Sequence, residues 1–348
     1  MGQKGKRIRL GALVRLFVLG GTVDSSKAHL ITLWCAVLSK SDKGIVRLLP
    51  KDVPLTHFRV LAQMTMPDGR EATSIRLARA LVLKPADVSA ALEALELKGF
   101  VRPVGEGDAG PGGNAGASAT AAGHATRGQR PRTWELSPAG SEVADGLLAS
   151  VSEFLEECRM KVPPHERALL SEMLANALNV PGSFYAGRNA VSPEDVIAFP
   201  PYRVTAFAMI RQAISAAVKS SLGLSLTDFR FLLELYPKKR GVTKMLRAKD
   251  MVVYLRTGRS YVTTASLRLE EDGYIERIPD PDDARGILFR LTGAGTAAVQ
   301  EVGEDIFTVF VSLSNEHIDD RRIIHALKLL LEGQEEALAR RGVTRARA

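Results

Sequence analysis

The chain repeats itself, and this internal repeat constrains its fold more than any other feature of its 348 residues. The segment LTHFRVL begins at residue 55, and LTDFRFL begins 171 positions later, at residue 226. Two further blocks recur in the same order. The paired blocks are residues 55–61 and 226–232, 88–91 and 262–265, and 136–140 and 291–295. Three blocks that keep their order predict two copies of one structural module.

The offset between the copies falls from 174 at the second block to 155 at the third, so the first copy carries 19 extra residues there (174 − 155 = 19). They lie in residues 105–128, a run dominated by Gly, Ala, Ser and Thr, which predicts a long flexible wing loop. Residues 179–202 contain Pro-Gly, Ser-Pro and Pro-Pro pairs and are predicted to be a linker. The predicted organisation is a basic N-terminal segment (1–27), a first module (28–178), the linker (179–202), a second module (203–340) and a basic tail (341–348).

The second copy carries the clearer pattern of elements. Helical spacing of apolar residues predicts helices over residues 204–221, 228–235, 244–255, 258–271, 294–313 and 321–337. Thr227 and Thr292 are the predicted helix caps. Residues 274–278 alternate like a strand, and residues 286–291 can return beside them across a Pro/Asp turn. Helices followed by a hairpin predict a mainly α fold with small β-hairpin wings (α+β): two tandem winged helix-turn-helix domains with flanking dimerisation-type helices.

The helix predicted over residues 258–271 is amphipathic. Its expected core residues are Val262, Ala265, Ser266 and Leu269. Its polar side carries Arg259, Ser260, Thr263 and Thr264. In a winged helix, the helix before the hairpin lies in the major groove of DNA. Arg pairs with guanine, and Ser and Thr donate to bases or phosphates, so this side is a candidate DNA-reading surface; a face that only meets water is the alternative.

Charge and composition narrow the class of protein. The net charge is +8, from 47 Lys and Arg against 39 Asp and Glu, which favours polyanionic partners: nucleic acid first and an anionic membrane surface second. Cys35 and Cys158 offer no disulfide framework and favour a reducing, cytoplasmic compartment. The apolar run over residues 10–21 is interrupted by Arg15 and is too short to span a bilayer, so no membrane partner is predicted.

Three stretches of the second copy resemble the multiple-antibiotic-resistance regulator (MarR) family. They are LEEDGYIER from residue 269, DPDDAR from residue 280 and LTGAG from residue 291. The resemblance covers roughly residues 202–335. It implies a DNA-binding regulator that forms homodimers through intertwined terminal helices and that often responds to a small aromatic or anionic effector. It also implies that Asp283 and Arg285 belong to the wing.

The first copy departs from this pattern. Its matching helix, residues 85–97, has Pro and Asp where the second copy has Arg259 and Tyr261. Lys84 is the nearby cation at the start of that helix. The loop over residues 105–128 replaces the acidic wing motif. The first copy is therefore either a weaker, differently specific DNA reader or a module that mainly completes the pair.

These observations predict a sequence-specific DNA-binding transcriptional regulator, with repression as its expected effect and double-stranded DNA as its partner. The two copies are expected to pair within one monomeric chain as an intramolecular pseudo-dimer, with a homodimer as the alternative assembly. The alternative function is a winged-helix interaction or ligand-sensor module that does not read DNA. The expected DNA contacts are Lys84, Ser89, Arg127, Arg130, Arg132, Arg256, Arg259, Ser260, Thr263, Thr264, Arg268, Asp283 and Arg285. Trp34, Tyr202 and Phe207 are candidates for lining an effector pocket.

No catalytic or metal chemistry is predicted. The sequence has no phosphate-binding loop, nucleophile elbow or paired-acid motif, so an enzyme is not expected. The six histidines are dispersed, and the cluster of His317 and His325 with nearby Asp residues is interpreted as a solvated helix end, so neither a metal nor a cofactor is expected. Cys35 is interpreted as a buried core thiol rather than an oxidant sensor, because apolar residues surround it and no base is evident.

Overall fold

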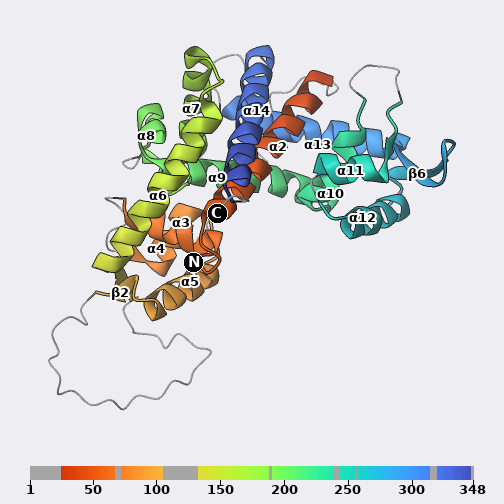
Figure 1. Ribbon diagram of the computed structural model, residues 1–348. Coiled ribbons are helices and arrows are strands. Elements are labelled where there is room, and N and C mark those ends of the chain that lie inside the picture. The colour runs from red at the N-terminus through yellow and green to blue at the C-terminus, as the bar shows by residue number, and fades with distance from the viewer. Residues whose placement is uncertain are drawn as a thin grey trace, which may run out of the picture. The chain divides into compact units, whose positions relative to one another are not determined.

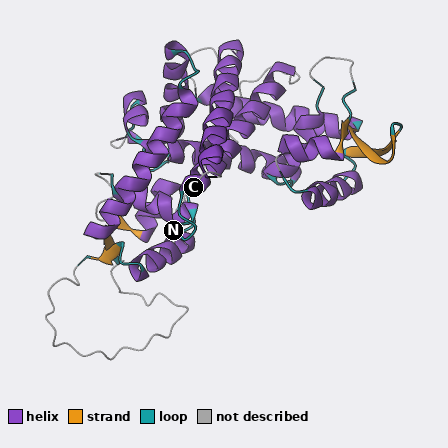
Figure 2. Ribbon diagram, in the orientation of Figure 1, coloured by secondary structure: helices purple, strands orange, loops and turns teal. Residues whose placement is uncertain are grey.

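The computed structural model describes residues 25–66, 72–104, 132–187, 190–237, 243–255, 257–313 and 320–345. These parts are mostly helical and contain two small antiparallel sheets, as expected from the sequence (Figures 1 and 2). The elements of the first half are α2 (Ser25–Leu48), α3 (Leu55–Met64), β1 (Ala72–Thr73), α4 (Ser74–Leu81), α5 (Pro85–Leu97), β2 (Val101–Pro103), β3 (Thr133–Leu136), α6 (Pro138–Arg159), α7 (Pro164–Leu178) and α8 (Pro193–Ala198). Those of the second half are α9 (Pro200–Leu222), α10 (Leu226–Leu235), β4 (Leu246–Arg247), α11 (Ala248–Leu255), α12 (Arg259–Glu271), β5 (Ile275–Asp280), β6 (Asp283–Leu291), α13 (Gly293–Ser312) and α14 (Asp320–Arg345).

Two segments of the chain have the same order of elements. The series from α3 to α6 corresponds to the series from α10 to α13, and in each series the helix before the hairpin, α5 or α12, spans 13 residues. α3 and α10 start 171 residues apart, α5 and α12 start 174 apart, and α6 and α13 start 155 apart, which are the offsets of the repeated sequence blocks. The sheets also correspond, with strand orders β1-β3-β2 and β4-β6-β5. Both segments therefore have the element order and strand pairing of a winged helix.

Local capping chemistry explains where several helices begin. Ser137 and Thr292 cap α6 and α13, each accepting the N–H of a glycine three residues later, so the predicted Thr292 cap is confirmed. The predicted Thr227 cap is wrong. Ser225 accepts the N–H of Asp228 and donates its hydroxyl back to the Asp228 carboxylate, so α10 begins at Leu226.

The helix predicted over residues 244–255 is wrong in its first part. Leu246 and Arg247 form β4, which pairs antiparallel with Phe289 and Leu288 of β6, and α11 begins only at Ala248. This pairing joins segments that are distant in sequence, so helical spacing within the segment does not reveal it. The last helix is longer than predicted, and residues 179–202 contain α8 and the first residues of α9.

A glycine at the same place in both winged helices allows two backbones to touch. A Cβ atom on Gly140 would lie 1.8 Å from the carbonyl oxygen of Phe100, and one on Gly295 would lie 2.0 Å from that of Tyr274. Any side chain would therefore collide with the backbone that leads into the hairpin. The two glycines let α6 and α13 start directly against that backbone.

The described chain forms two compact units. The C-terminal unit consists of residues 25–37 and 210–328, and the N-terminal unit consists of residues 38–209 and 329–345. The division falls within α2, α9 and α14, so each of these helices contributes residues to both units. Each unit thus combines a winged helix with helical residues from the other half of the sequence.

In the C-terminal unit, the early residues of α2 pack against α13. Trp34 stacks on Phe310 with ring centroids 5.6 Å apart, and the Lys27 ammonium pairs with Glu304 at 3.1 Å. The winged-helix core includes an edge-to-face contact between Phe231 of α10 and Phe289 of β6, with ring centroids 5.3 Å apart. These contacts hold α2 against α13 and α10 against β6.

In the N-terminal unit, α14 is tied to α2 by polar groups that the fold buries. The Gln334 amide donates to the hydroxyl of Ser41 at 2.7 Å, and the buried Lys40 ammonium pairs with Glu335. Buried polar groups need such partners, because leaving them unpaired costs about 1–3 kcal/mol each. Among the described residues, no helix is long and apolar enough to cross a membrane.

Candidate nucleic-acid interface

α12 lies in the C-terminal unit immediately before the β5–β6 hairpin (Figure 1). It starts at Arg259 after a Gly258 N-cap, one residue later than the predicted start, and ends at Glu271 as predicted. Its buried residues are Val262, Ala265, Ser266 and Leu269, which confirms the predicted core face. The packing of this face leaves the other side of the helix to solvent.

The outward side of α12 brings together four of the predicted DNA contacts. Arg259, Ser260, Thr263 and Thr264 are all exposed. The Thr263 and Thr264 hydroxyls each donate to the backbone carbonyl four residues earlier at 3.1 Å. Hydroxyl groups can rotate, so they can give up this local bond to donate to a base edge or phosphate. The surface offers a guanidinium and three hydroxyls on a rigid helix.

Arg268 is on α12 as well, and although its side chain is exposed, its guanidinium is engaged by another side chain of the protein. It donates to the Asp228 carboxylate of α10, which also accepts a hydrogen bond of 2.8 Å from the Tyr261 hydroxyl. Asp228 is only 3% exposed. Burial alone would raise the pKa of this carboxyl, but the hydrogen bonds from Ser225, Tyr261 and Arg268 together hold that pKa below its ordinary value.

The hydrogen bond between Tyr261 and Asp228 also affects the pKa of Tyr261. Its burial and its hydrogen bond to Asp228 raise the pKa of its phenol to about 12. The hydrogen bond between the two groups favours the ionised carboxylate and the protonated phenol; burial acts in the same direction on the pKa of Tyr261 and in the opposite direction on that of Asp228. Asp228 and Tyr261 were not singled out by the sequence reasoning. The available signal was the repeated block itself, in which Asp228 replaces the His57 of the first copy.

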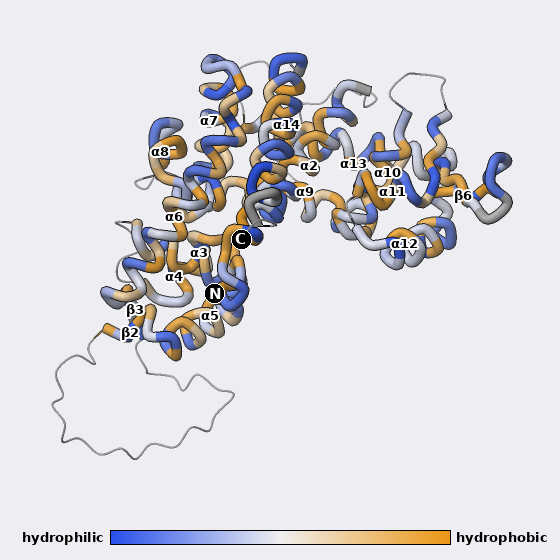
Figure 3. The backbone as a smooth tube through the Cα atoms, viewed as in Figure 1, coloured by the Kyte–Doolittle hydropathy of each residue, from blue (hydrophilic) through white to orange (hydrophobic). Residues whose placement is uncertain are grey.

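The hairpin is held by a second ionic contact. The Arg247 guanidinium of β4 donates to Asp280 at 3.2 Å and to Asp282 at 2.9 Å, and it holds the pKa of the Asp280 carboxyl below its usual value. Asp280 also accepts the backbone N–H of Asp282 at 3.0 Å. These contacts brace the turn between β5 and β6, whose described residues are hydrophilic in Figure 3.

The predicted wing residues lie at this turn. Asp283 is the first residue of β6 and is exposed, and Arg285 lies two residues further along the same strand. The side chain of Arg285 and the whole of Arg256 lie outside the described residues. Arg247 was not identified from the sequence as a wing contact. Its segment was predicted to be helical, and a helix there would not suggest pairing with Asp280 and Asp282.

The N-terminal winged helix presents different chemistry at the matching place. Lys84, the N-cap residue of α5, is exposed, whereas Ser89 is half-buried. The exposed side of α5 carries the carboxylates of Asp87 and Glu93. Arg132, at the start of β3, pairs with Glu96 of α5 at 2.8 Å and lies over the Trp134 ring. Arg127 and Arg130 lie outside the described residues.

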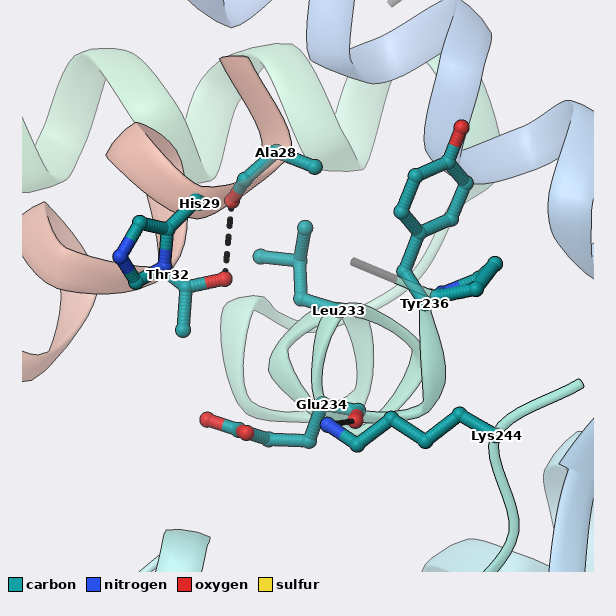
Figure 4. A pocket seen from close by; sticks show the side chains of 8 residues that line it. Ala28, His29, Thr32, Leu233, Glu234, Tyr236 and Lys244 are labelled. Carbon is teal, nitrogen blue, oxygen red and sulfur yellow. Dashed lines mark hydrogen bonds between the residues drawn. The ribbon is translucent and has the colours of Figure 1, made fainter. Parts of the chain in front are cut away.

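A small pocket opens in the C-terminal unit beside α10, and Figure 4 shows its lining. Its residues are Ala28, His29, Thr32, Leu233, Glu234, Tyr236, Pro237 and Lys244. The Lys244 ammonium donates to the carbonyl of Glu234 across one side. The cavity measures about 70 Å³, much less than the roughly 300–1,000 Å³ of a typical ligand site. Within the described ranges, no group of His, Cys, Asp and Glu is placed to hold a metal ion.

The three aromatic residues predicted for an effector pocket lie elsewhere. Trp34 and Phe207 are buried in the core. Tyr202 is half-buried and meets the Tyr185 ring edge-on. Cys35 is buried, and that burial raises the pKa of its thiol to about 11, so the prediction of a core thiol is confirmed.

Comparison with known proteins places a family domain over this site. Residues 224–287 match the model of the MarR family, so the chain contains one MarR family domain, which runs from the start of α10 into β6. Over 66 residues the chain is 35% identical to the HTH-type transcriptional regulator BilQ of Clostridioides difficile (strain CD3). That match covers 19% of this chain and 42% of the relative, so the chain spans about two fifths of BilQ's length. The crystal structure of Sco3205, a MarR family transcriptional regulator from Streptomyces coelicolor in complex with DNA, is similar with 19% identity and a TM-score of 0.30, covering 38% of this chain and 80% of that one.

Proposed function

We propose that the chain is a DNA-binding transcriptional regulator whose C-terminal winged helix reads base pairs with α12. The observation that carries this proposal is the exposed surface of Arg259, Ser260, Thr263 and Thr264 on the helix that precedes the hairpin. An Arg pairs bidentately with guanine in the major groove, and Ser and Thr bond bases or phosphates. The MarR family domain over the same residues and the relative named a transcriptional regulator support this function.

In this proposal the β5–β6 hairpin contacts DNA beside the groove that α12 enters. The turn is braced by Arg247, so residues 283–285 are presented on a rigid finger. Arg285 would enter the minor groove there, because a narrow minor groove attracts guanidinium groups. Repression would follow if the bound site overlaps a promoter.

We propose that the two halves act together as an intramolecular pseudo-dimer. Support comes from the contacts within each unit: in one, Trp34 of α2 stacks on Phe310 of α13, and in the other, Gln334 of α14 donates to Ser41 of α2. Terminal helices that are covered in this way by the same chain need no second chain to bury their apolar faces. The pairing would then hold at any dilution.

We assign the N-terminal winged helix a supporting role in this pair. Its α5 exposes the carboxylates of Asp87 and Glu93, which phosphates repel. The positions that match Ser260 and Thr264 of α12 are alanines, Ala86 and Ala90. Lys84, at the start of α5, can still contact the DNA backbone. The expected binding site therefore has one well-specified half and one loosely specified half.

The test of base reading uses a duplex selected from a random pool by the wild-type chain. Arg259→Ala should weaken binding by about 1–3 kcal/mol and relax the preference at one base pair. Arg322→Ala is the matched control, because Arg322 is also an exposed arginine of the same unit, on α14. Wild-type affinity should fall steeply as salt rises. Equal effects of the two variants, or affinity independent of salt, would contradict the proposal.

The test of the pseudo-dimer is sedimentation of the wild-type chain with that duplex. The expected species are a monomer in solution and a complex of one chain with one duplex. A complex of two chains on one duplex, with no monomer bound at any ratio, would show that the pairing occurs between chains instead.

A further inference from the structure

We propose that Asp228 and Arg268 form a clamp that positions α12, and that Arg268 acts through this clamp rather than by contacting DNA. The clamp consists of Asp228 on α10 with Tyr261 and Arg268 on α12. The clamp itself is a feature of the free protein, whereas its consequence for DNA binding rests on the proposed function.

The clamp fixes α12 at both of its ends. Tyr261 lies in the first turn of the helix and Arg268 in its last turns, and both donate to the same carboxylate oxygen, Oδ1 of Asp228. The two residues are seven apart, which is about two helical turns, so they lie on one side of the helix. Two donors on one acceptor constrain both the rotation of α12 and its position along its axis.

The acceptor is itself immobile. Asp228 is buried at the first turn of α10, where its other oxygen, Oδ2, accepts the hydroxyl of the capping residue Ser225 at 2.7 Å. The carboxylate therefore has both oxygens occupied and cannot turn away from α12 without breaking the cap. The cap of one helix and the orientation of the next depend on a single side chain.

Rotation of α12 decides which side chains face outward. Neighbouring residues are about 100° apart around a helix, so even a fraction of that rotation would move Arg259 and Thr263 away from the groove. Catalytic and binding groups need to be held within about 10–20° of their working geometry. By fixing the rotation of α12, the clamp would control the DNA affinity of the surface around Arg259 and Thr263, although the clamp residues do not contact DNA themselves.

The sign of a charge effect separates positioning from simple electrostatics. Asp228→Asn removes a negative charge, which by itself should tighten binding to a polyanion. The clamp predicts the opposite, a loss of about tenfold in affinity, because a charge-assisted contact is broken. Glu271→Gln is the matched control: Glu271 is an exposed carboxylate in the last turn of α12, and its loss should leave affinity unchanged or slightly higher.

The role of Arg268 is tested by combining substitutions. Arg268→Ala should also lower affinity about tenfold, with no further loss when it is combined with Asp228→Asn and no change in the salt dependence. A phosphate contact would instead give additive losses and reduce the salt slope by about one unit. Additive losses with that smaller slope, or tighter binding by Asp228→Asn, would overturn the proposal.

A measurement without DNA tests the clamp directly. The phenolate absorbance of Tyr261, taken as the difference between the wild-type chain and Tyr261→Phe, should show ionisation only near pH 12. In Asp228→Asn it should move toward the ordinary value of about 10. An unchanged titration would mean that the contact does not exist in solution. If the wild-type chain binds no duplex, the proposed function fails, but this titration still decides the clamp.

Folding of the variants is followed by circular dichroism. If Asp228→Asn does not fold, Arg268→Ala and Tyr261→Phe carry the test, since both side chains are partly exposed and are expected to be tolerated. Their effects on affinity should then be less than additive, because both act through Asp228. Independent, additive effects would count against a shared clamp.

Discussion

α12 and α5 are the helices before the hairpin in two segments with the same order of elements; they start 174 residues apart and expose different chemistry. α12 presents a guanidinium and hydroxyls, whereas α5 presents Asp87 and Glu93. Inward-facing residues do correspond: Val262 and Leu269 of α12 match Val88 and Leu95 of α5, and all four are buried. The comparison shows that the core and the outward surface of one architecture are specified by separate sets of residues.

The two modules also differ in how the helix before the hairpin is held. The positions of Asp228, Tyr261 and Arg268 are taken by His57, Asp87 and Ala94 in the N-terminal winged helix. An alanine donates no side-chain hydrogen bond, so this set cannot form the clamp. The hairpin strands are shorter as well, three and four residues in β2 and β3 against six and nine in β5 and β6. The contacts that can hold the helix and the lengths of the hairpin strands therefore differ between the two modules, as the exposed side chains of the helix do.

The largest expected effect concerns what the two modules share. Gly140→Ala and Gly295→Ala should each lower the free energy of unfolding by about 3 kcal/mol or more, because the new Cβ would overlap a backbone oxygen that cannot move aside. Chemical denaturation of the whole chain measures the loss. Equal losses would establish that both modules need the close approach.

The glycine experiment has a control on each helix. A Cβ atom added to Gly146 of α6 or to Gly293 of α13 would meet nothing within 4 Å, so alanine there should be neutral or stabilise by up to about 1 kcal/mol. If Gly140→Ala were as mild as Gly146→Ala, the close approach of Gly140 to the Phe100 carbonyl would not exist, and the two modules would differ at this position.

An intermediate effect should come from the acidic surface of α5. Replacing Asp87 and Glu93 together by Ala should tighten DNA binding about threefold, because two carboxylates no longer repel nearby phosphates. The control replaces Glu194 and Glu301, two carboxylates that belong to neither α5 nor α12. Equal affinities for the two double variants would place α5 away from the DNA and leave DNA contact to the C-terminal module.

The smallest effect should appear in the pH dependence of stability. Burial of His57, reinforced by Lys98, holds the pKa of its imidazole below the ordinary value. Such a group stabilises the fold above about pH 6.5, and this contribution is lost as the pH falls through the lower, folded pKa. The lowered pKa of Asp228 has the same sign, but its contribution is lost only below about pH 4.

Thermal unfolding at pH 7 and pH 5 distinguishes the two positions. The wild-type chain should lose stability over this range relative to His57→Gln, whereas the difference between the wild-type chain and Asp228→Asn should stay constant. A pH-independent difference for His57→Gln would mean that the partly buried environment of the imidazole does not lower its pKa.

Sequence reasoning succeeded where short-range rules decide the structure. The Thr292 cap follows from local chemistry, and the core face of α12 follows from helical spacing. The surface of Arg259 and its neighbours followed from the same spacing. These features involve residues only a few positions apart, so a single sequence contains all the information that they need.

Features that depend on distant partners were not predicted. β4 exists because Leu246 pairs with Phe289, and Arg268 faces Asp228 across 40 residues of sequence. Nothing near Leu246 distinguishes a strand from the first turn of a helix. The Thr227 cap failed for a subtler reason: Ser225 and Thr227 can both cap a helix, and only the partnership of Ser225 with Asp228 decides between them.

The division of α2, α9 and α14 between the two units has a consequence for cutting the chain. Severing it near residue 190, between its two halves, would not release either unit intact, because each would lack helical residues that the other fragment carries. The two fragments would have to associate before either unit could complete its fold. The two halves of the polypeptide are therefore expected to depend on each other for folding.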